Sequence, residues 1–147
     1  LIHSEIMGNK WRKLKYNLQA IEESGKKGLV TMGGAYSNHI VATAAAAKLA
    51  GIEAIGIIRG EELSESSNPS LQFAANQGMK FKFVDRSTYR SLRTDLNLIA
   101  SQYPDYYFLP EGGTNDLAVK GCTEIIPEIS IPFDVIVTPI GTGGTFA

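Results

Sequence analysis

The stretch MGGAYSNHIV, residues 32–41, connects two segments of different character. The short apolar run GLVTM at 28–32 leads into it and predicts a buried strand, and the small apolar residues at 37–50 predict a helix. Ser37 or Asn38 can cap that helix, because a side-chain oxygen at this position accepts a hydrogen bond from a free backbone N–H. A strand that turns through paired glycines into a helix is the repeating unit of an α/β fold.

The same alternation continues along the chain. We expect further strands at 54–60, 80–86, 106–110 and 134–141, and further helices at 11–24, 69–77, 87–102 and 114–126. The strands show little alternation of polar and apolar residues, which is typical of a parallel sheet covered on both faces. The sequence therefore predicts an α/β fold of three layers, with a parallel sheet, helices on both of its faces and right-handed crossovers.

The segment PEISIPF at 127–133 interrupts this pattern with two prolines and is the expected domain boundary. The chain begins at Leu1 and stops at Ala147, directly after a glycine loop that should open a helix. We therefore expect it to be part of a longer chain. The strand near 134–139 would then lack sheet partners, and an unpaired strand edge is prone to aggregate.

Composition excludes several classes of function. A net charge of −1 over 147 residues gives no reason to expect nucleic acid or an acidic membrane surface as a partner. No apolar run approaches the roughly 20 residues needed to span a bilayer. Cys122 is the single cysteine and the histidines, His3 and His39, are isolated, so we expect neither a disulfide nor a metal site. A lone cysteine suits a reducing compartment, and we expect a cytoplasmic protein.

Three expected strand ends are followed by polar and glycine-rich turns: GGAYSN at 33–38, EGGTN at 111–115 and GTGGT at 141–145. Ligands of parallel sheets bind at the carboxyl ends of the strands, so we expect these turns on one rim. In GTGGT the glycines let the backbone approach an anion, and Thr142 and Thr145 can add hydroxyl donors. The motif is neither a Walker loop nor a dinucleotide fingerprint. It predicts a phosphate-binding loop, with a flexible turn as the alternative.

The segment GNKWRKLKY at 8–16 places Lys10 at an expected helix start and Lys13 one turn later on the same face. A neighbouring cation and a helix N-terminus both disfavour the ammonium form of a lysine. A neutral amine is what carbonyl chemistry requires. The alternative is an ordinary basic amphipathic helix. For His39, residue type alone favours a partly buried structural role over that of a base.

The order of these motifs along the chain is more specific than any one of them. Gly-Asn-Lys, then Gly-Gly-x-x-Ser-Asn-His, then Leu-Pro-Glu-Gly-Gly-Thr-Asn, then Gly-Thr-Gly-Gly-Thr resembles the pyridoxal-phosphate enzymes of fold type II. The chain is most similar to the branch that contains 1-aminocyclopropane-1-carboxylate deaminase and D-cysteine desulfhydrase, over essentially all 147 residues. The resemblance implies that residues 1–10 end an N-terminal segment of a large domain, 11–130 form a small α/β domain, and 131–147 begin the C-terminal part of the large domain.

The resemblance also implies roles for single residues. Lys10 matches the lysine that is linked covalently to the cofactor, pyridoxal 5'-phosphate, and that later moves protons. Asn38 matches the asparagine that hydrogen-bonds the cofactor's 3-hydroxyl oxygen, and it also borders the substrate. Ser37, a second catalytic candidate, and His39 match residues that face the substrate. The implied phosphate site consists of Lys13, Gly141, Thr142, Gly143, Gly144 and Thr145.

Tyr36 and Ala35 depart from the branch, where Gln and Ile are common, so we expect Tyr36 to influence the choice of substrate. The pyridine-nitrogen partner and a catalytic tyrosine of the family have no counterpart in this sequence. The implied activity is that of a lyase or hydrolase, most similar to 1-aminocyclopropane-1-carboxylate deaminase, which releases ammonia and a 2-oxo acid from a small amino acid. The alternatives are a D-cysteine desulfhydrase, which releases pyruvate, sulfide and ammonia, and a non-catalytic module that binds a phosphorylated ligand. We expect a homodimer.

Overall fold

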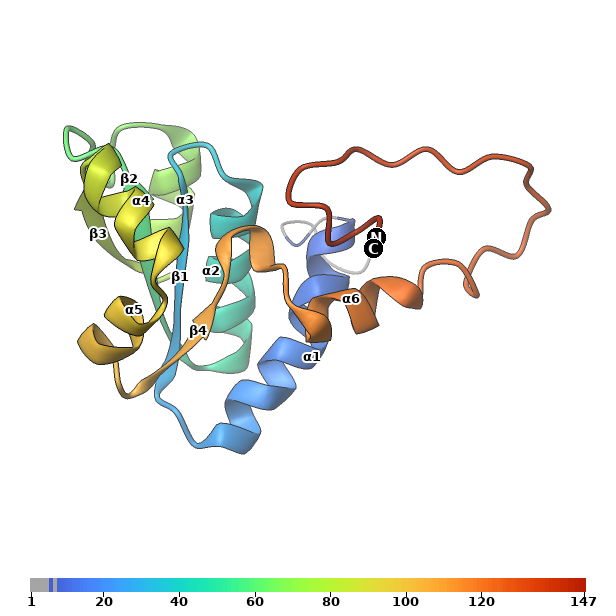
Figure 1. Ribbon diagram of the computed structural model, residues 1–147, viewed down its shortest axis with the longest axis horizontal. Coiled ribbons are helices and arrows are strands. Elements are labelled where there is room, and N and C mark those ends of the chain that lie inside the picture. The colour runs from blue at the N-terminus through green and yellow to red at the C-terminus, as the bar shows by residue number, and fades with distance from the viewer. Residues whose placement is uncertain (1–5, 7) are drawn as a thin grey trace.

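The computed structural model describes residue 6 and residues 8–147, which include a parallel sheet of four strands (Figure 1). The strands are β1 (Gly28–Gly34), β2 (Glu53–Arg59), β3 (Lys80–Val84) and β4 (Tyr106–Leu109), in the order β3-β2-β1-β4. In the register of the two central strands, Gly28 is paired with Glu53 and Gly34 with Arg59. All three strand pairs are parallel, as the sequence predicts.

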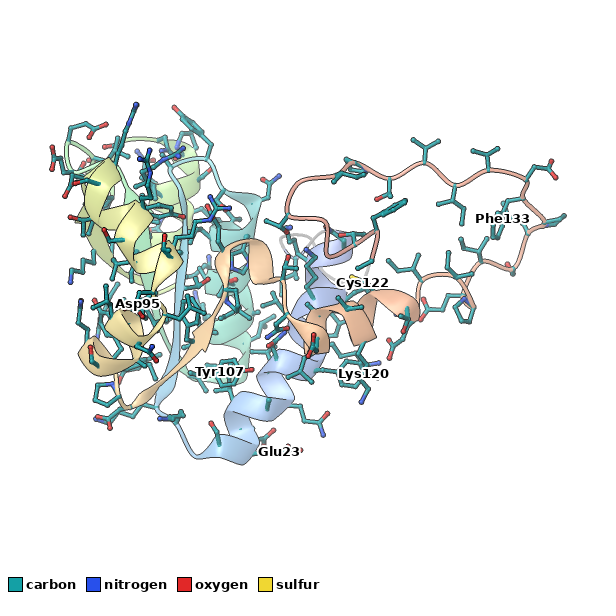
Figure 2. The ribbon with its side chains drawn as sticks, in the orientation of Figure 1. Glu23, Asp95, Tyr107, Lys120, Cys122 and Phe133 are labelled. Atoms are coloured by element: carbon teal, nitrogen blue, oxygen red, sulfur yellow. The ribbon has the colours of Figure 1, made fainter. Side chains whose placement is uncertain are left out.

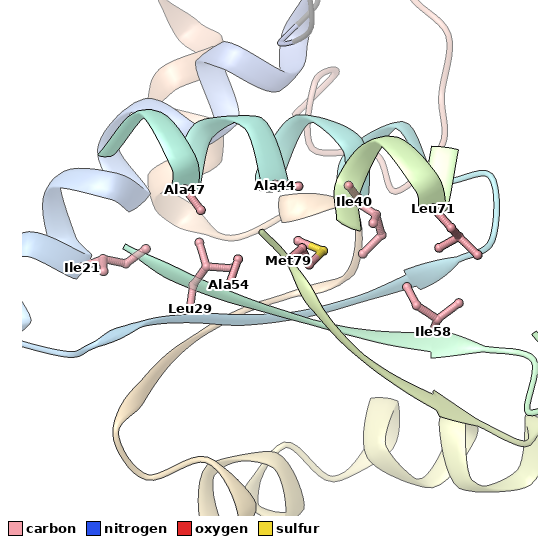
Figure 3. Packing of buried hydrophobic residues seen from close by; sticks show 10 residues of the cluster. Ile21, Leu29, Ile40, Ala44, Ala47, Ala54, Ile58, Leu71 and Met79 are labelled. Carbon is pink, nitrogen blue, oxygen red and sulfur yellow. The ribbon is translucent and has the colours of Figure 1, made fainter. Parts of the chain in front are cut away.

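Helices cover both faces of the sheet. These helices are α1 (Asn9–Ser24), α2 (Asn38–Ala50), α3 (Pro69–Asn76), α4 (Arg86–Thr94) and α5 (Asn97–Gln102). A short 3-10 turn, η1 (Glu111–Gly113), follows β4, and a further helix, α6 (Asp116–Thr123), packs against α1 (Figure 1). One core lies between the sheet and α1, α2 and α3, and it includes Leu29 (Figure 3). A second core lies between the opposite face and α4 and α5, and it includes Val30. The predicted three-layer α/β fold is confirmed.

The opening stretch has the local structure that its residues favour. Ser37 is the N-cap of α2, and its Oγ accepts a hydrogen bond from the backbone N–H of Ile40. The helix ends at Gly51, which has a left-handed conformation with φ 67°. A residue with a Cβ adopts this conformation at a cost, so glycine is the usual helix terminator here.

The predicted helix at 87–102 is wrong in one respect, because the chain forms two helices there. Asp95 ends α4 with extended backbone angles, φ −121° and ψ 96°, which a helix cannot continue through. Its side chain accepts a hydrogen bond from the backbone N–H of Asn97, the first residue of α5. The local side-chain bond competes with the helical ladder, as is common for aspartate.

The predicted strand at 134–141 is not formed in the structure. Within the part of the chain that the structure describes, no strand lies beside this segment to complete a hydrogen-bond ladder. Its apolar side chains are exposed: Val137 is 90% accessible and Val135 75%. The chain beyond α6 loops away from the sheet through Phe133 and returns toward the start of α1 (Figures 1 and 2).

The helix expected after the glycine loop is represented by a single turn. The backbone N–H groups of Phe146 and Ala147 both donate to the carbonyl oxygen of Gly143, at 2.8 and 3.2 Å. Among the helices that the structure describes, none has the length and apolar character needed to cross a membrane.

The paired glycines at the end of β1 differ in the space around them, which gives a stability prediction. A Cβ on Gly33 would lie 2.6 Å from Cγ1 of the buried Ile40 and 3.1 Å from Cβ of Ser37, whereas a Cβ on Gly34 meets nothing within 4 Å. Gly33→Ala should therefore lower the free energy of unfolding by about 1–3 kcal/mol through overpacking. Gly34→Ala, the matched control, should change it by less than about 0.5 kcal/mol in urea titrations. Equal effects of the two substitutions would contradict this account.

Candidate functional site

A pocket of about 800 Å³ lies at the carboxyl ends of β1 and β4. It brings together residues from all three glycine-rich turns and from the start of α1, including Lys10, Ser37, Asn38, Glu111, Gly112 and Thr142. The first and the last of these residues, Lys10 and Thr142, are more than 100 positions apart in the sequence. The strand-end rule explains why the turns after β1 and β4 meet, since parallel strands end on the same edge of the sheet, whereas the glycine loop and the start of α1 reach this edge without a preceding strand.

Lys10 lies in the first turn of α1 and is half-buried in this pocket. Burial lowers the pKa of its ammonium group, because the charged form loses hydration. The sequence interpretation assigned this effect to a neighbouring cation, Lys13, and to the helix N-terminus. In the structure burial is the main cause for both lysines, and the charge of Lys10 lowers the pKa of Lys13 as a second cause. A lysine with this environment is a better nucleophile near neutral pH than an exposed one.

Lys13 is 2% exposed, and its Nζ donates three hydrogen bonds to neutral oxygens. The acceptors are Oγ1 of Thr114 at 3.0 Å, the carbonyl of Gly112 at 3.3 Å and Oγ1 of Thr142 at 3.3 Å. Among the described residues no carboxylate lies within ion-pair distance of this ammonium. A buried cation surrounded only by neutral oxygens is stabilised strongly by a bound anion.

Two glycines allow the chain to pack closely around this ammonium group. A Cβ on Gly144 would lie 3.1 Å from Nζ of Lys13 and 2.6 Å from Cγ2 of Thr114. A Cβ on Gly112, which has φ 70°, would lie 2.5 Å from Cγ2 of Thr142. The loop is also held to the start of α1, where Nδ2 of Asn9 donates to Oγ1 of Thr145 at 2.6 Å. The backbone can therefore approach a phosphate closely, as the glycine motif predicts.

Ser37 and Asn38 border the same pocket at the start of α2. The cap hydrogen bond of Ser37 is long, 3.4 Å from Oγ to the N–H of Ile40, so its hydroxyl can also contact a ligand. Asn38 is exposed. The helix N-terminus supplies a positive dipole end and free N–H groups near these side chains, an arrangement that suits a carboxylate.

His39 is placed differently from its neighbours, because its ring is buried and both nitrogens have partners within the protein. Thr31 Oγ1 donates to the carbonyl of Leu109 at 2.8 Å, so it accepts from Nε2 of His39 at 2.7 Å. Nδ1 then accepts from Oγ1 of Thr43 at 3.3 Å. Burial, followed by the charges of Lys10 and Lys13, lowers the His39 pKa to about 3. The ring is a neutral connection between α2 and β1, and a contact with substrate stays a prediction.

Tyr36 does not line the lysine pocket. Its side chain is 75% exposed and borders a neighbouring cavity of about 780 Å³, which Arg59 and Asp85 also line. The turn at 34–37 separates the two cavities. The expectation that Tyr36 influences substrate choice therefore has no support from direct proximity to Lys10.

Sequence reasoning missed an ionic group at the pocket rim. Glu111 uses both carboxylate oxygens: Oε1 accepts a hydrogen bond from Oη of Tyr89 at 2.7 Å, and Oε2 forms an ion pair with Nε of Arg93 at 3.2 Å. Burial raises the pKa of Tyr89, and the carboxylate raises it further, so the phenol remains a donor. Tyr89 and Arg93 are four positions apart on α4 and share a face, which is the signal that the sequence offered.

Fold and site together define an α/β protein in which a half-buried lysine lines a pocket at the carboxyl ends of parallel strands, beside a second, buried lysine ammonium with no carboxylate partner among the described residues. A family model described as pyridoxal-phosphate dependent enzyme matches residues 3–147. The chain therefore belongs to the family of pyridoxal-phosphate dependent enzymes, and the resemblance seen in the sequence is confirmed.

Within this family, the chain is similar to proteins named for two related activities. A putative 1-aminocyclopropane-1-carboxylate deaminase of Pyrococcus horikoshii is 31% identical over 150 residues, which is 97% of this chain and 45% of that protein. A bifunctional D-cysteine desulfhydrase/1-aminocyclopropane-1-carboxylate deaminase of Arabidopsis thaliana is 27% identical over 97% of this chain and 40% of that protein. The crystal structure of an ACC deaminase homologue superposes with a TM-score of 0.77 at 30% identity, over 95% of this chain and 45% of that one. The chain spans about half the length of these relatives.

The residues present fit the cofactor of this family. A phosphate requires cationic and N–H donors without a nearby carboxylate, and Lys13, the threonine hydroxyls and the glycine loop meet that requirement. A carbonyl group requires an amine that loses its proton readily, and burial gives Lys10 this property. Asn38 borders the same pocket and offers a neutral amide to a ring oxygen.

The buried imidazole of His39 gives a pH prediction. Below pH 6.5 the unfolded chain gains a proton on His39, whereas the folded protein does not until about pH 3, so the free energy of unfolding falls as pH decreases through this window. Between pH 7 and pH 5 the loss from this one group should be about 2 kcal/mol. Between pH 7 and pH 5 the free energy of unfolding of His39→Gln, measured in urea, should therefore decrease by about 2 kcal/mol less than that of the wild type.

Thr43→Val is the control for this measurement, because it leaves the imidazole in place and should retain the pH dependence of the wild type. If His39→Gln shows the same pH dependence as the wild type, His39 is not the buried neutral group that the structure indicates.

Proposed function

We propose that the protein acts as a pyridoxal-phosphate dependent deaminase on a small amino acid, most similar to 1-aminocyclopropane-1-carboxylate deaminase, and releases ammonia and a 2-oxo acid. The observation that supports this most strongly is that Lys10 lines one pocket with Gly141 and Thr142 of the glycine loop, while the buried ammonium of Lys13 is hydrogen-bonded to Thr142 beside it. Relatives with that activity in their names match almost the whole chain. The second candidate is D-cysteine desulfhydrase activity, which the Arabidopsis relative has together with the first.

The side chains of this pocket can divide the work of such a reaction. Pyridoxal phosphate, when bound, supplies an electron sink for bonds at the α-carbon of an amino acid. Lys10 would supply the amine that holds the cofactor and could accept or return a proton at Nζ. Lys13, whose ammonium is bonded to the hydroxyls of Thr114 and Thr142, would hold the phosphate together with them. Asn38 would donate to the ring oxygen, and Ser37 with the N–H groups of α2 would bind the substrate carboxylate.

The domain division belongs to this proposal as well. Residues 11–130 would form the small domain, and 1–10 and 131–147 would belong to a larger one. Exposed apolar side chains beyond residue 130, such as Ile131, Val135 and Val137, support this division, because such side chains are usually covered in a folded protein. We also propose a homodimer, on the family resemblance, and a cytoplasmic location, which the single cysteine suits; sedimentation and fractionation would test them.

The covalent role of Lys10 has a direct chemical test. Borohydride reduction of the full-length protein loaded with pyridoxal phosphate should attach the cofactor to Lys10, located by mass spectrometry of peptides. Lys10→Ala should abolish that adduct, whereas Lys15→Ala, an exposed lysine on the same helix, should leave it unchanged. Cofactor that binds to the wild type without any adduct would support the non-catalytic phosphate-binding module instead.

The substrate is tested by offering two amino acids separately to the loaded protein. Formation of 2-oxobutanoate from 1-aminocyclopropane-1-carboxylate would support the deaminase, and formation of pyruvate with sulfide from D-cysteine would support the desulfhydrase. The deaminase proposal predicts that the first has the higher kcat/KM. The absence of both products would overturn both candidates while leaving the cofactor assignment standing.

A further inference from the structure

The buried face of α1 bears a line of polar groups that continues past the pocket. Lys10, Lys13 and Asn17 are spaced by three and four positions, so they lie on one side of the helix. Exposure decreases along this line, from the half-buried Lys10 to Lys13 at 2% and Asn17 at 0%. A fully buried amide needs partners for all of its polar atoms, so the partners of Asn17 indicate its purpose.

Asn17 forms a reciprocal pair with the side chain of Asn115. Nδ2 of Asn115 donates to Oδ1 of Asn17 at 2.7 Å, and Nδ2 of Asn17 donates back to Oδ1 of Asn115 at 3.1 Å. Nδ2 of Asn17 also donates to the carbonyl of Lys13 at 2.7 Å. Oη of Tyr107 donates to Oδ1 of Asn17 at 3.3 Å (Tyr107 is labelled in Figure 2). Both amide hydrogens and both acceptor positions of Asn17 are thereby used.

These bonds connect the two chain segments that surround the buried ammonium. On one side Asn17 contacts the backbone of Lys13 itself. On the other it holds Asn115, whose Oδ1 also caps α6 by accepting from the N–H of Ala118 at 2.9 Å. Thr114 directly precedes Asn115, and its hydroxyl is the nearest acceptor of the Lys13 ammonium, at 3.0 Å. The amide pair therefore fixes the position of Thr114 relative to Lys13.

We propose that Asn17 is a positioning residue for the phosphate end of the site: through Asn115 it places the Thr114 hydroxyl and the Lys13 ammonium where they bind a phosphate group together. This inference rests on the proposed function for the identity of the ligand. Asn17 is too deeply buried to touch the ligand itself, and it acts through Lys13 and Thr114.

A merely structural role for Asn17 makes a different prediction. If the amide pair only joins α1 to α6, its loss should weaken every ligand of the pocket equally, through a general loss of stability. If it positions the phosphate site, its loss should weaken ligands in proportion to their phosphate contacts. Pyridoxal 5'-phosphate and pyridoxal differ only in the phosphate, so the ratio of their dissociation constants separates the two roles.

The experiment measures that ratio, by absorbance titration, for the full-length protein freed of cofactor. In Asn17→Leu the Kd of pyridoxal phosphate should rise about tenfold while that of pyridoxal changes less than about twofold. The control is Gln19→Ala, an exposed residue of α1 bonded only to Glu23 in the structure, which should leave both constants unchanged. Inorganic phosphate is followed as a competitor of pyridoxal phosphate. Its affinity should decrease in Asn17→Leu, as that of pyridoxal phosphate does.

A second variant covers the case in which Asn17→Leu fails to fold. Thr114→Val leaves the amide pair intact and removes the hydroxyl that the pair positions, so it should give the same selective loss. Combined with Asn17→Leu, it should add little, since the two act on one contact. Equal weakening of both ligands in Asn17→Leu, or a Thr114→Val protein with an unchanged ratio, would overturn the proposal. Failure of the covalent role of Lys10 is a distinct outcome, because the wild type would then bind pyridoxal phosphate without an adduct, and competition by inorganic phosphate would still report on Asn17.

Discussion

The site depends on one electrostatic constraint, which is the placement of a lysine ammonium in a buried position with only neutral oxygens around it. Lys13 approaches within hydrogen-bond distance of a 3-10 turn, a threonine that precedes a helix, and a distant glycine loop. A carboxylate in their place would neutralise the ammonium and repel an incoming anion. The small side chains around Lys13 also let the backbone of three separate segments converge, which few other residue types would permit.

Most of the fold could be predicted from the sequence because its local signals agree with one another. The apolar run of β1, the serine cap and the terminal Gly51 of α2 all indicate the same strand–turn–helix unit, and the structure has it. The failures occurred where a distant or competing contact decides the outcome. Asp95 divides the expected helix because its side chain accepts a hydrogen bond from the backbone N–H of Asn97. The segment 134–141 is rich in β-branched residues but forms no strand, because a strand needs a partner to which it can hydrogen-bond, and no local pattern reveals whether one is present.

The glycine turns and lysines of the site could be predicted from the sequence, but the buried polar residues that hold them in place could not. Motifs at expected strand ends were enough to predict that the turns of Ser37 and Thr142 would meet, and the family resemblance added Lys10, although the strand expected before Thr142 is not formed. Asn17 lies in a largely polar helix and Thr31 in an apolar strand, and neither residue has a recognisable sequence signature until its hydrogen-bond partners are known. The sequence also could not predict which cavity the Tyr36 side chain borders, because a residue in the turn at 34–37 can face either of the two adjoining cavities.

The order of the strands in the sheet explains where the pocket forms. From β1 the chain adds β2 and β3 on one side, and then returns to place β4 on the other side of β1. Between β1 and β4 lies the topological switch point of the sheet, where the segments that follow the two strands diverge and leave a crevice. Residues 37–39 after β1 and 111–112 after β4 form its two walls. The opening is thus produced by the connectivity of the sheet and not by a gap in packing, and the two faces of the sheet beside it remain covered by packed apolar side chains.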